Sequence, residues 1–170
     1  MVCLSKRLPA CRYGTCVAEF RRSVEVDCPV GEVFEWHRDT RNAALISPPS
    51  LRVVEVDGTF PLNEGDEVSL LVRPRGAPVG QRLRIRIAQM RTPRLIVDEM
   101  LQGPFRRWHH EHAFRDLGDG RTRVTDNIQY ELPLHLEALM GPVVRNRLDA
   151  TFAFRHRRTA ELLAAARPTR

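Results

Sequence analysis

Between residues 51 and 132 the chain repeats one pattern, in which short segments of alternating apolar and polar residues are separated by turn-forming residues. In residues 82–87, for example, three arginines alternate with Leu83, Ile85 and Ile87. A period of two is typical of β-strands with one buried face. Because the connections are short, an antiparallel meander is the simplest topology. The pattern predicts six strands, over residues 51–56, 67–73, 82–87, 95–101, 105–117 and 123–132.

Helical patterns and one more strand flank this region. Residues 18–27 alternate with the same period and predict a first strand. Residues 29–37 predict a short helix that begins at Pro29, and residues 40–46 predict a second one that ends before Pro48. Residues 134–140 form another short helical segment, which Gly141 and Pro142 separate from a long amphipathic helix over residues 142–166. The order is therefore strand, two helices, six strands and a long helix.

This order indicates the fold class. We predict an α+β fold in which a curved antiparallel sheet of about seven strands wraps the long C-terminal helix, with two short helices after the first strand. Strand twist accumulates across such a sheet and curls it. One helix is only about 10 Å wide, and aromatic residues make up only 6% of the chain. We therefore expect a pocket between the helix and the sheet.

Length and composition are those of one globular domain. A chain of 170 residues has room for one well-filled core. We assign residues 18–166 to a single ligand-binding domain and residues 1–17 to an N-terminal tail that need not be ordered. The four cysteines lack CxxC spacing and nearby histidines, so we expect reduced thiols. Without a long apolar run or a secretory leader, we expect a cytoplasmic protein with no stable membrane insertion.

The charge of the chain bears on its partners. The net charge is +6, and Lys6 is the only lysine, so arginine supplies nearly all the positive charge. The arginines are spread along the chain and interleaved with acidic residues rather than gathered in a patch. We therefore expect no nucleic-acid partner. The sequence makes no prediction of the oligomeric state.

Several stretches resemble the SRPBCC superfamily, which includes START lipid-transfer domains, plant pollen-allergen homologues and polyketide cyclases. Two motifs are similar to those of small bacterial members: W-x-H-x-H-x-F on a late strand and F-x-[FY]-R-H-R-R-T on the last helix. The resemblance covers about residues 19–163 and implies a helix-grip fold and ligand binding, without implying a particular reaction. The stretches that carry it are FRRSVEVDCPVGEVFEWH, the Ser47-Pro48-Pro49 segment, GPFRRWHHEHAF, RVTDNIQYELP and FAFRHRRTAELL.

The late strand over residues 105–117 carries the first candidate site residues. Alternation places Trp108, His110, His112 and Phe114 on one face, and the two large aromatic residues indicate that this face points inward. On the next strand, counting from a hairpin turn near residues 118–119 places His112 roughly opposite residue 125 or 126, which brings Asp126 close to it. A carboxylate in that position would fix the tautomer of the imidazole and raise its pKa.

The last helix carries the remaining candidates. Phe152 lies in its apolar stripe, Arg155 lies near the centre of the stripe, and His156 lies at its edge. An arginine in this position either points into the pocket or pairs with a carboxylate, for which Asp126 and Glu99 are the candidates. The predicted result is a polar floor of His110, His112, Asp126 and Arg155 beneath an apolar pocket.

Three roles for this polar floor stay open: holding the helix to the sheet, orienting a ligand, and acid–base catalysis. His110, His112 and Asp126 are also suitable metal ligands by type, but histidines two apart on a strand commonly occur without a metal. We expect neither a metal nor a cofactor. The predicted ligand-binding residues are Trp108, His110, His112, Phe114, Asp126, Tyr130, Phe152, Arg155 and His156.

No enzyme motif decides the function. The chain has no GxSxG elbow, P-loop, GxGxxG or HExxH sequence. We expect binding of a hydrophobic small molecule, such as a lipid, polyketide or isoprenoid, in an internal cavity. Two alternatives stay open. One is a cyclase- or dehydratase-like enzyme with His/Asp acid–base chemistry. The other is an accessory partner of an NAD-dependent epimerase-like enzyme, because related domains occur joined to such enzymes.

Overall fold

The computed structural model describes residues 17–166, so the predicted tail lies outside the described residues apart from Val17. The elements follow the predicted order along the chain. They are β1 (Ala18–Val26), α1 (Val30–His37), η1 (Thr40–Ala44), β2 (Leu51–Asp57), β3 (Glu67–Pro74), β4 (Gln81–Arg91), β5 (Leu95–Gln102), β6 (Arg107–Gly118), β7 (Arg121–Glu131), η2 (Pro133–His135) and α2 (Glu137–Ala165).

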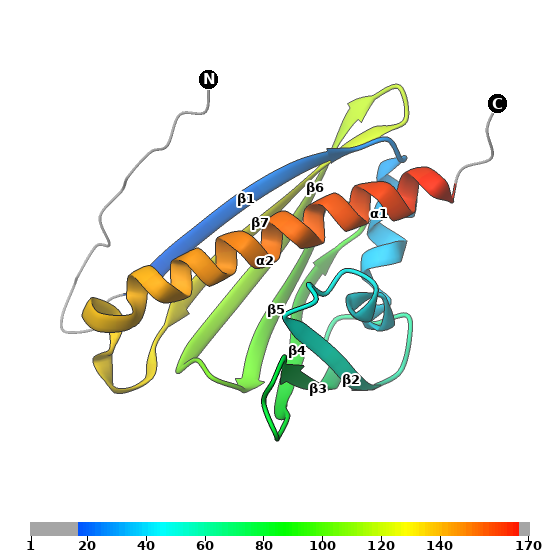
Figure 1. Cartoon of the computed structure of the whole chain (residues 1–170). Helices are drawn as coiled ribbons and strands as arrows, with labels where there is room; N and C mark the ends of the chain where they lie inside the picture. The colour runs from blue at the N-terminus through cyan, green and yellow to red at the C-terminus, as the bar shows by residue number, and fades with distance from the viewer. Residues whose placement is uncertain (1–16, 167–170) are drawn as a thin grey trace.

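The seven strands form one antiparallel sheet in the order β1-β7-β6-β5-β4-β3-β2. From β2 to β7 each strand pairs with its neighbour in sequence, so the predicted meander is confirmed, and β1 pairs with β7. Figure 1 shows the sheet curling behind α2, which lies across it with α1 near its C-terminal part. The predicted α+β helix-grip architecture is therefore confirmed.

Irregular pairing contributes to the curl of the sheet. The register shifts between Val53 and Glu55 in the β2–β3 pair, and again between Ile87 and Gln89 in the β4–β5 pair. Such a bulge bends a strand and increases its local twist. The bulge also explains why β4 is longer than the predicted strand over residues 82–87. The alternation stops at Ile87, but the bulge resets the register and pairing continues to Arg91.

Two helix predictions need correction. The second short helix, predicted over residues 40–46, is a 3-10 helix that covers only Thr40–Ala44. The predicted break at Gly141 and Pro142 is wrong, because α2 is one helix of 29 residues with Pro142 inside it. Pro142 stands within the first two turns, where it removes a single i→i−4 hydrogen bond while the rest of the helix continues. Within the described residues no helix has both the length and the apolar character needed to cross a membrane.

The apolar core consists of two clusters. The first lies around α1 and includes Phe34, Phe114, Val124 and Leu163. The second lies between the sheet and the N-terminal half of α2, and its buried members are Phe20, Ile128, Tyr130, Leu132, Leu148 and Phe152.

Buried polar residues separate these clusters on three elements. On β7, Asp126 lies between Val124 of the first cluster and Ile128 of the second. On α2, His156 lies between Phe152 of the second cluster and Leu163 of the first. On β6, His110 and His112 lie between Trp108, which packs against the second cluster, and Phe114 of the first. A polar layer therefore crosses the interior between the helix and the sheet.

Candidate functional site

A pocket of about 370 Å³ lies between α2 and strands β2–β6. Trp36 and His37 from α1 line one part of it, and Trp108 and Phe152 line another. Aliphatic side chains form most of the remaining wall, chiefly Val68, Leu70, Leu83, Ile85, Ile87, Ile96 and Met100. The wall is therefore largely apolar, as the sequence pattern of the strands led us to expect.

Three adjacent strands position a row of ionisable side chains across the sheet. Asp98 on β5 pairs in register with His110 on β6, and His112 on β6 pairs with Asp126 on β7. Residues directly opposite one another in antiparallel strands point to the same face. The hairpin predicted residue 125 or 126 opposite His112, and the structure has Asp126 there. All four side chains thus converge on the face that α2 covers.

Asp126 is the centre of this network. His110 Nε2 donates to Asp126 Oδ1 over 2.8 Å, and His156 Nε2 on α2 donates to Asp126 Oδ2. His112 Nδ1 lies 2.7 Å from Asp126 Oδ1, although its direction is not that of a hydrogen bond. Asp126 is itself buried, with 4% of its surface exposed. A buried carboxylate is stable only with such donors around it.

Asp98 is a second buried carboxylate, which sequence reasoning did not select. His112 Nε2 donates to Asp98 Oδ2 over 3.0 Å, and His110 Nδ1 lies 3.3 Å from the same oxygen. The signal for Asp98 was present in the alternation of its strand, because Ile96, Asp98 and Met100 share one face. All three residues line the pocket.

The network shifts the acidity of its members. Burial alone would raise the pKa of Asp98, but His110 and His112 outweigh it and hold that pKa well below the usual range. Burial would likewise raise the pKa of Asp126, and the three histidines together lower it. Burial alone would lower the pKa of His112, but its contacts with Asp126 and Asp98 raise that pKa to about 9. Without other ligands, His112 is therefore an imidazolium paired with two carboxylates at neutral pH.

His37 lies close to His112, with 6.0 Å between the ring centroids. Its Nδ1 donates to the carbonyl of Val33 over 2.7 Å, which leaves Nε2 without the proton. Burial, together with the charge of His112, lowers the pKa of His37 to about 4. His37 is therefore a neutral imidazole in the pocket wall.

Arg155 lines the pocket, as one of the two predicted alternatives required. Its guanidinium carbon lies 5.3 Å from the centroid of the Phe152 ring. Among residues 17–166 this guanidinium has no hydrogen bond and no ion pair. Glu99, one of the two candidate partners, instead accepts a hydrogen bond from Arg86 on the outer face of the sheet. Asp126 bonds histidines instead of pairing with Arg155. Burial lowers the pKa of Arg155, yet an arginine remains charged.

The inner face of α2 differs from the predicted stripe by a small rotation. The sequence placed Arg155 near the centre of the stripe and His156 at its edge. In the structure His156 is buried and Arg155 is only partly buried. The buried side chains of α2 are Leu148, Phe152, His156, Thr159 and Leu163.

The predicted ligand-binding residues fall into two groups. Four of them lie behind the pocket wall and do not line it. Phe114 packs edge-on against Phe34 with ring centroids 5.6 Å apart, and Tyr130 packs against Phe105. The other two are Asp126, which bonds the wall residue His110, and His156, which bonds Asp126 from α2. The predicted residues that do line the pocket are Trp108, His110, His112, Phe152 and Arg155.

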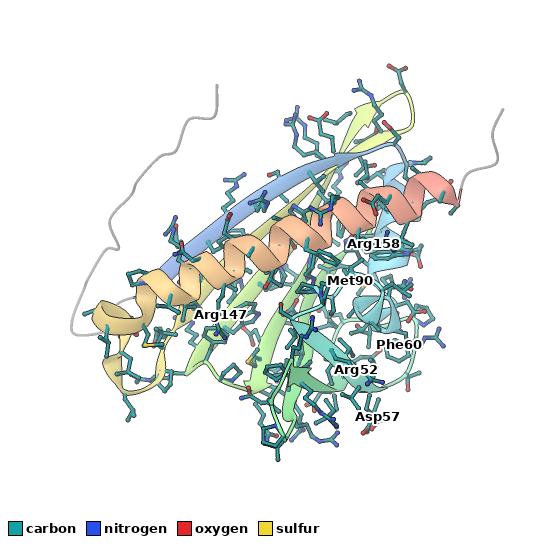
Figure 2. The ribbon with its side chains drawn as sticks, in the orientation of Figure 1. Arg52, Asp57, Phe60, Met90, Arg147 and Arg158 are labelled. Atoms are coloured by element: carbon teal, nitrogen blue, oxygen red, sulfur yellow. The ribbon has the colours of Figure 1, made fainter. Side chains whose placement is uncertain are left out.

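Several pocket residues were not selected from the sequence. Arg147 was expected at the surface and is indeed exposed, yet it also lines the pocket. Met90 on β4 lines it from the opposite side. Figure 2 labels both residues, with Arg147 on α2 and Met90 below the middle of the helix. Their position depends on where α2 crosses the sheet, which no single segment of sequence specifies.

Several solved structures share this fold. Norcoclaurine synthase from Thalictrum flavum, in complex with dopamine and hydroxybenzaldehyde, is 12% identical with a TM-score of 0.67, over 97% of this chain and 100% of that chain. A START superfamily protein from Mycobacterium smegmatis is 12% identical with a TM-score of 0.66, over 88% and 99%. The di-domain ARO/CYC BexL from the BE-7585A biosynthetic pathway is 17% identical with a TM-score of 0.70, over 89% and 51%. The chain thus has the helix-grip fold, as the resemblance implied.

Sequence comparison gives a narrower result. No curated protein sequence matches the chain. A family model described as "Domain of unknown function (DUF8410)" matches residues 77–163, which span β4 through most of α2 and include the whole polar network. The match covers just over half of the 170 residues. The chain therefore belongs to the DUF8410 family.

Proposed function

We propose that this protein binds a hydrophobic small molecule, of the lipid, polyketide or isoprenoid kind, in the pocket beneath α2. The observation that carries the proposal is how the chemistry of the pocket wall is divided. Aliphatic side chains of β3 and β4, with Ile96 and Met100 of β5, form one side. The charged and polar side chains gather on the other side, where Asp98 of β5 lies with His110, His112 and Arg155 next to β6 and α2. Small-molecule sites are typically apolar with a few polar groups that orient the ligand.

Arg155 is the group that orients the ligand in this proposal. Its N–H donors are available to a ligand, because among the residues described the guanidinium has no hydrogen-bond or ion-pair partner and lies against the face of the Phe152 ring. The nearby carboxylates of Asp98 and Asp126 bond histidines. A guanidinium presents its N–H groups as a planar fork that matches a carboxylate. A ligand with an acidic end would place that end against Arg155 and its apolar body against β3–β5.

The polar network has a supporting role here. The bond from His156 to Asp126 joins α2 to β7, and the neighbouring Phe152 packs edge-on against His110 with ring centroids 5.4 Å apart. The network thereby holds the pocket-lining part of the helix in place. Other proteins of this fold support a small molecule as the ligand, since the norcoclaurine synthase structure contains dopamine and hydroxybenzaldehyde.

A cyclase- or dehydratase-like activity is the second candidate. It is favoured by one observation, that His110 and His112 form part of the pocket wall where a ligand would meet them. The similarity in fold to an ARO/CYC protein points in the same direction. Turnover of a bound polyketide-like compound, lost in His112→Gln while binding persists, would identify an enzyme. Binding without turnover would identify a binding protein.

Two neighbouring residues of β5 provide a matched test of the binding site. Met100 lines the pocket, whereas Leu101, the next residue, is exposed on the other face. Met100→Trp should fill the pocket and weaken binding of a fluorescent fatty acid or polyaromatic probe by about tenfold or more, a loss of about 1.4 kcal/mol. Leu101→Trp should leave binding unchanged. Equal effects of the two variants would contradict the proposal.

The natural ligand requires a second measurement. Native mass spectrometry of the protein purified from its own host should detect a small apolar molecule bound to the wild type. The same molecule should be absent or depleted in Met100→Trp.

A further inference from the structure

We propose that Asp98, His110 and His112 bind one divalent transition-metal ion, of the Zn²⁺ class, with an open coordination position facing the pocket. The proposal goes beyond ligand binding and does not depend on it. It also departs from our expectation that the histidines are metal-free. The ligand set differs from the one considered in the sequence, because the carboxylate is Asp98 on β5 rather than Asp126 on β7.

The three candidate ligand atoms have the spacing of a coordination sphere. Asp98 Oδ2 lies 3.0 Å from His112 Nε2 and 3.3 Å from His110 Nδ1. All three atoms lie within 4.8 Å of one another. In a tetrahedral site with bonds of about 2.0–2.1 Å, neighbouring ligand atoms are roughly 3.3 Å apart. An ion would therefore fit with small movements of side chains that the sheet already positions.

Asp126 supplies a carboxylate for the ring nitrogens of His110 and His112 that would not bind the metal. A histidine ligand commonly presents its second ring nitrogen to a carboxylate, which orients the ring and makes it a better ligand. The nitrogens that do not face Asp98 both face Asp126. His110 Nε2 donates to Asp126 over 2.8 Å, and His112 Nδ1 lies 2.7 Å from it. The arrangement is thus a carboxylate behind two histidines, with a second carboxylate in front.

The burial of these residues is that of a site open on one side. Asp98, His110 and His112 line the pocket, whereas Asp126 lies behind them. The side chain of His110 is 4% exposed and that of His112 is 17% exposed. Metal sites that bind substrates or ligands keep a position free of protein atoms, whereas structural sites close their coordination sphere. Two imidazoles and one carboxylate suit Zn²⁺ and neighbouring first-row ions.

A purely structural role explains only part of the network. The part of the network that joins α2 to the sheet is the pair Asp126 and His156, which bond each other across that interface. Asp98 and its contacts with His110 and His112 lie entirely within the sheet, on β5 and β6. Burying a second carboxylate there is costly and adds nothing to the helix contact. A metal ion bound between these three residues would compensate the charge of the buried Asp98 carboxylate and so explain why it is there.

Two features oppose the ion and limit its affinity. The carboxylates favour a proton on His112, and this proton must leave when a metal binds. Arg155 adds a positive charge on the same side of the pocket. The two buried carboxylates together offset the charge of a divalent ion, so the site stays electrically balanced apart from Arg155. We therefore expect binding in the micromolar range rather than a permanent structural site.

The outer face of the same strand provides a matched control. His109 Nδ1 lies 3.6 Å from Glu99, and its Nε2 lies 3.5 Å from Glu111. This second histidine–carboxylate group lacks a buried carboxylate behind it. A change at His109 therefore tests for ordinary surface binding, whereas a change at His112 tests the proposed site. His112 is a better choice than His110 because it is less buried.

The experiment is calorimetric titration of the full chain with Zn²⁺ and with Co²⁺. Cys3, Cys11 and Cys16 are first replaced by serine, because free thiolates bind zinc themselves. We expect about one ion per chain, loss of this binding in His112→Gln, and no change in His109→Gln. Asp126→Asn should weaken binding by about 10- to 100-fold. Equal effects at His109 and His112, or no stoichiometric binding in the parent protein, would overturn the proposal.

Nuclear magnetic resonance of the wild-type ring nitrogens gives a result that does not depend on folded variants. Zn²⁺ should shift His110 Nδ1 and His112 Nε2, the two nitrogens that face Asp98, and leave His109 unaffected. Coordination through the other nitrogens, or shifts confined to His109, would show that the proposed geometry is wrong. Because no pocket ligand is needed, failure here leaves the proposed binding function untouched.

Discussion

His156 on α2 donates a hydrogen bond to Asp126 on β7, and both residues are buried where the two apolar clusters meet. The long helix is therefore joined to the sheet by a directional polar contact as well as by apolar packing. Such a contact requires one orientation of the helix, because the carboxylate must remain within reach of the imidazole. The shape of the neighbouring pocket therefore depends on this contact, because α2 forms one wall of the pocket.

Asp126→Asn should destabilise the protein strongly. The amide has no negative charge with which to compensate three surrounding imidazoles, so we expect the free energy of unfolding to fall by about 3 kcal/mol. Urea denaturation followed by circular dichroism measures this change. Asp57→Asn is the control, since Asp57 is exposed at the end of β2 (Figure 2) and should change stability by less than about 0.5 kcal/mol. Equal losses of unfolding free energy in the two variants would contradict the central role of Asp126 in the network.

Arg155→Met should weaken binding of acids more than binding of neutral compounds. Methionine keeps much of the length and packing of arginine but removes its charge and donors. We expect affinity for an alkyl or aryl carboxylate to fall by about 10- to 100-fold, and affinity for the matching alcohol to change little. Fluorescent-probe displacement measures both. Arg157→Met, at a side chain that is 60% exposed, should affect neither compound. A parallel loss for acid and alcohol would show that Arg155 only packs.

Phe152→Ala should leave a cavity in the second apolar cluster and destabilise the protein. Phe152 is 3% exposed and packs against Phe20 with ring centroids 5.3 Å apart. Removing a buried phenyl group costs about 3–5 kcal/mol of unfolding free energy. Phe154→Ala, two residues away and only partly buried, should cost clearly less. Thermal and urea denaturation of both variants measure the difference, and similar losses would place Phe152 outside the core.

Tyr130 should make stability fall at alkaline pH. Burial of Tyr130 raises the pKa of its phenol, so the folded protein holds this proton more tightly than the unfolded chain does. The resulting stabilisation is complete below the pKa of the unfolded chain, roughly 10, and is lost as the pH rises through the higher pKa of the folded state.

Tyr130→Phe removes this group and provides the comparison. Urea denaturation at about pH 8 and about pH 11 should show a larger loss of unfolding free energy for the wild type than for Tyr130→Phe. Identical pH dependence would mean that the buried phenol does not contribute.

The strands were predictable because each has one buried face. Alternation marks β2 to β7 in the sequence, and the short turns between them require antiparallel neighbours. The end of β4 was not predictable, because the bulge after Ile87 changes which side chains point inward. The start of α2 was missed for a different reason. Gly141 and Pro142 are common at helix ends, but near the beginning of a long helix one missing hydrogen bond does not end it.

The candidate site was predictable where it depends on one hairpin. Counting from the turn between β6 and β7 places His112 opposite residue 125 or 126, and the structure pairs it with Asp126. Asp98 lies on a strand whose register with β6 is set elsewhere, so it was not selected. The positions of Arg155 and His156 depend on how α2 rotates against the sheet. Two adjacent helix residues differ by about 100°, so a small rotation exchanges which one is buried.

The polar layer between the two apolar clusters has an energetic consequence for double variants. Substitutions at Phe34 and Phe20 fall in different clusters that share no buried member. Distant sites without common partners usually contribute additively. Substitutions at His110 and His156 both remove a donor to Asp126, so their effects should not sum. Thermodynamic coupling in this molecule is therefore concentrated around one carboxylate, and the hydrophobic interior on either side behaves as two independent compartments.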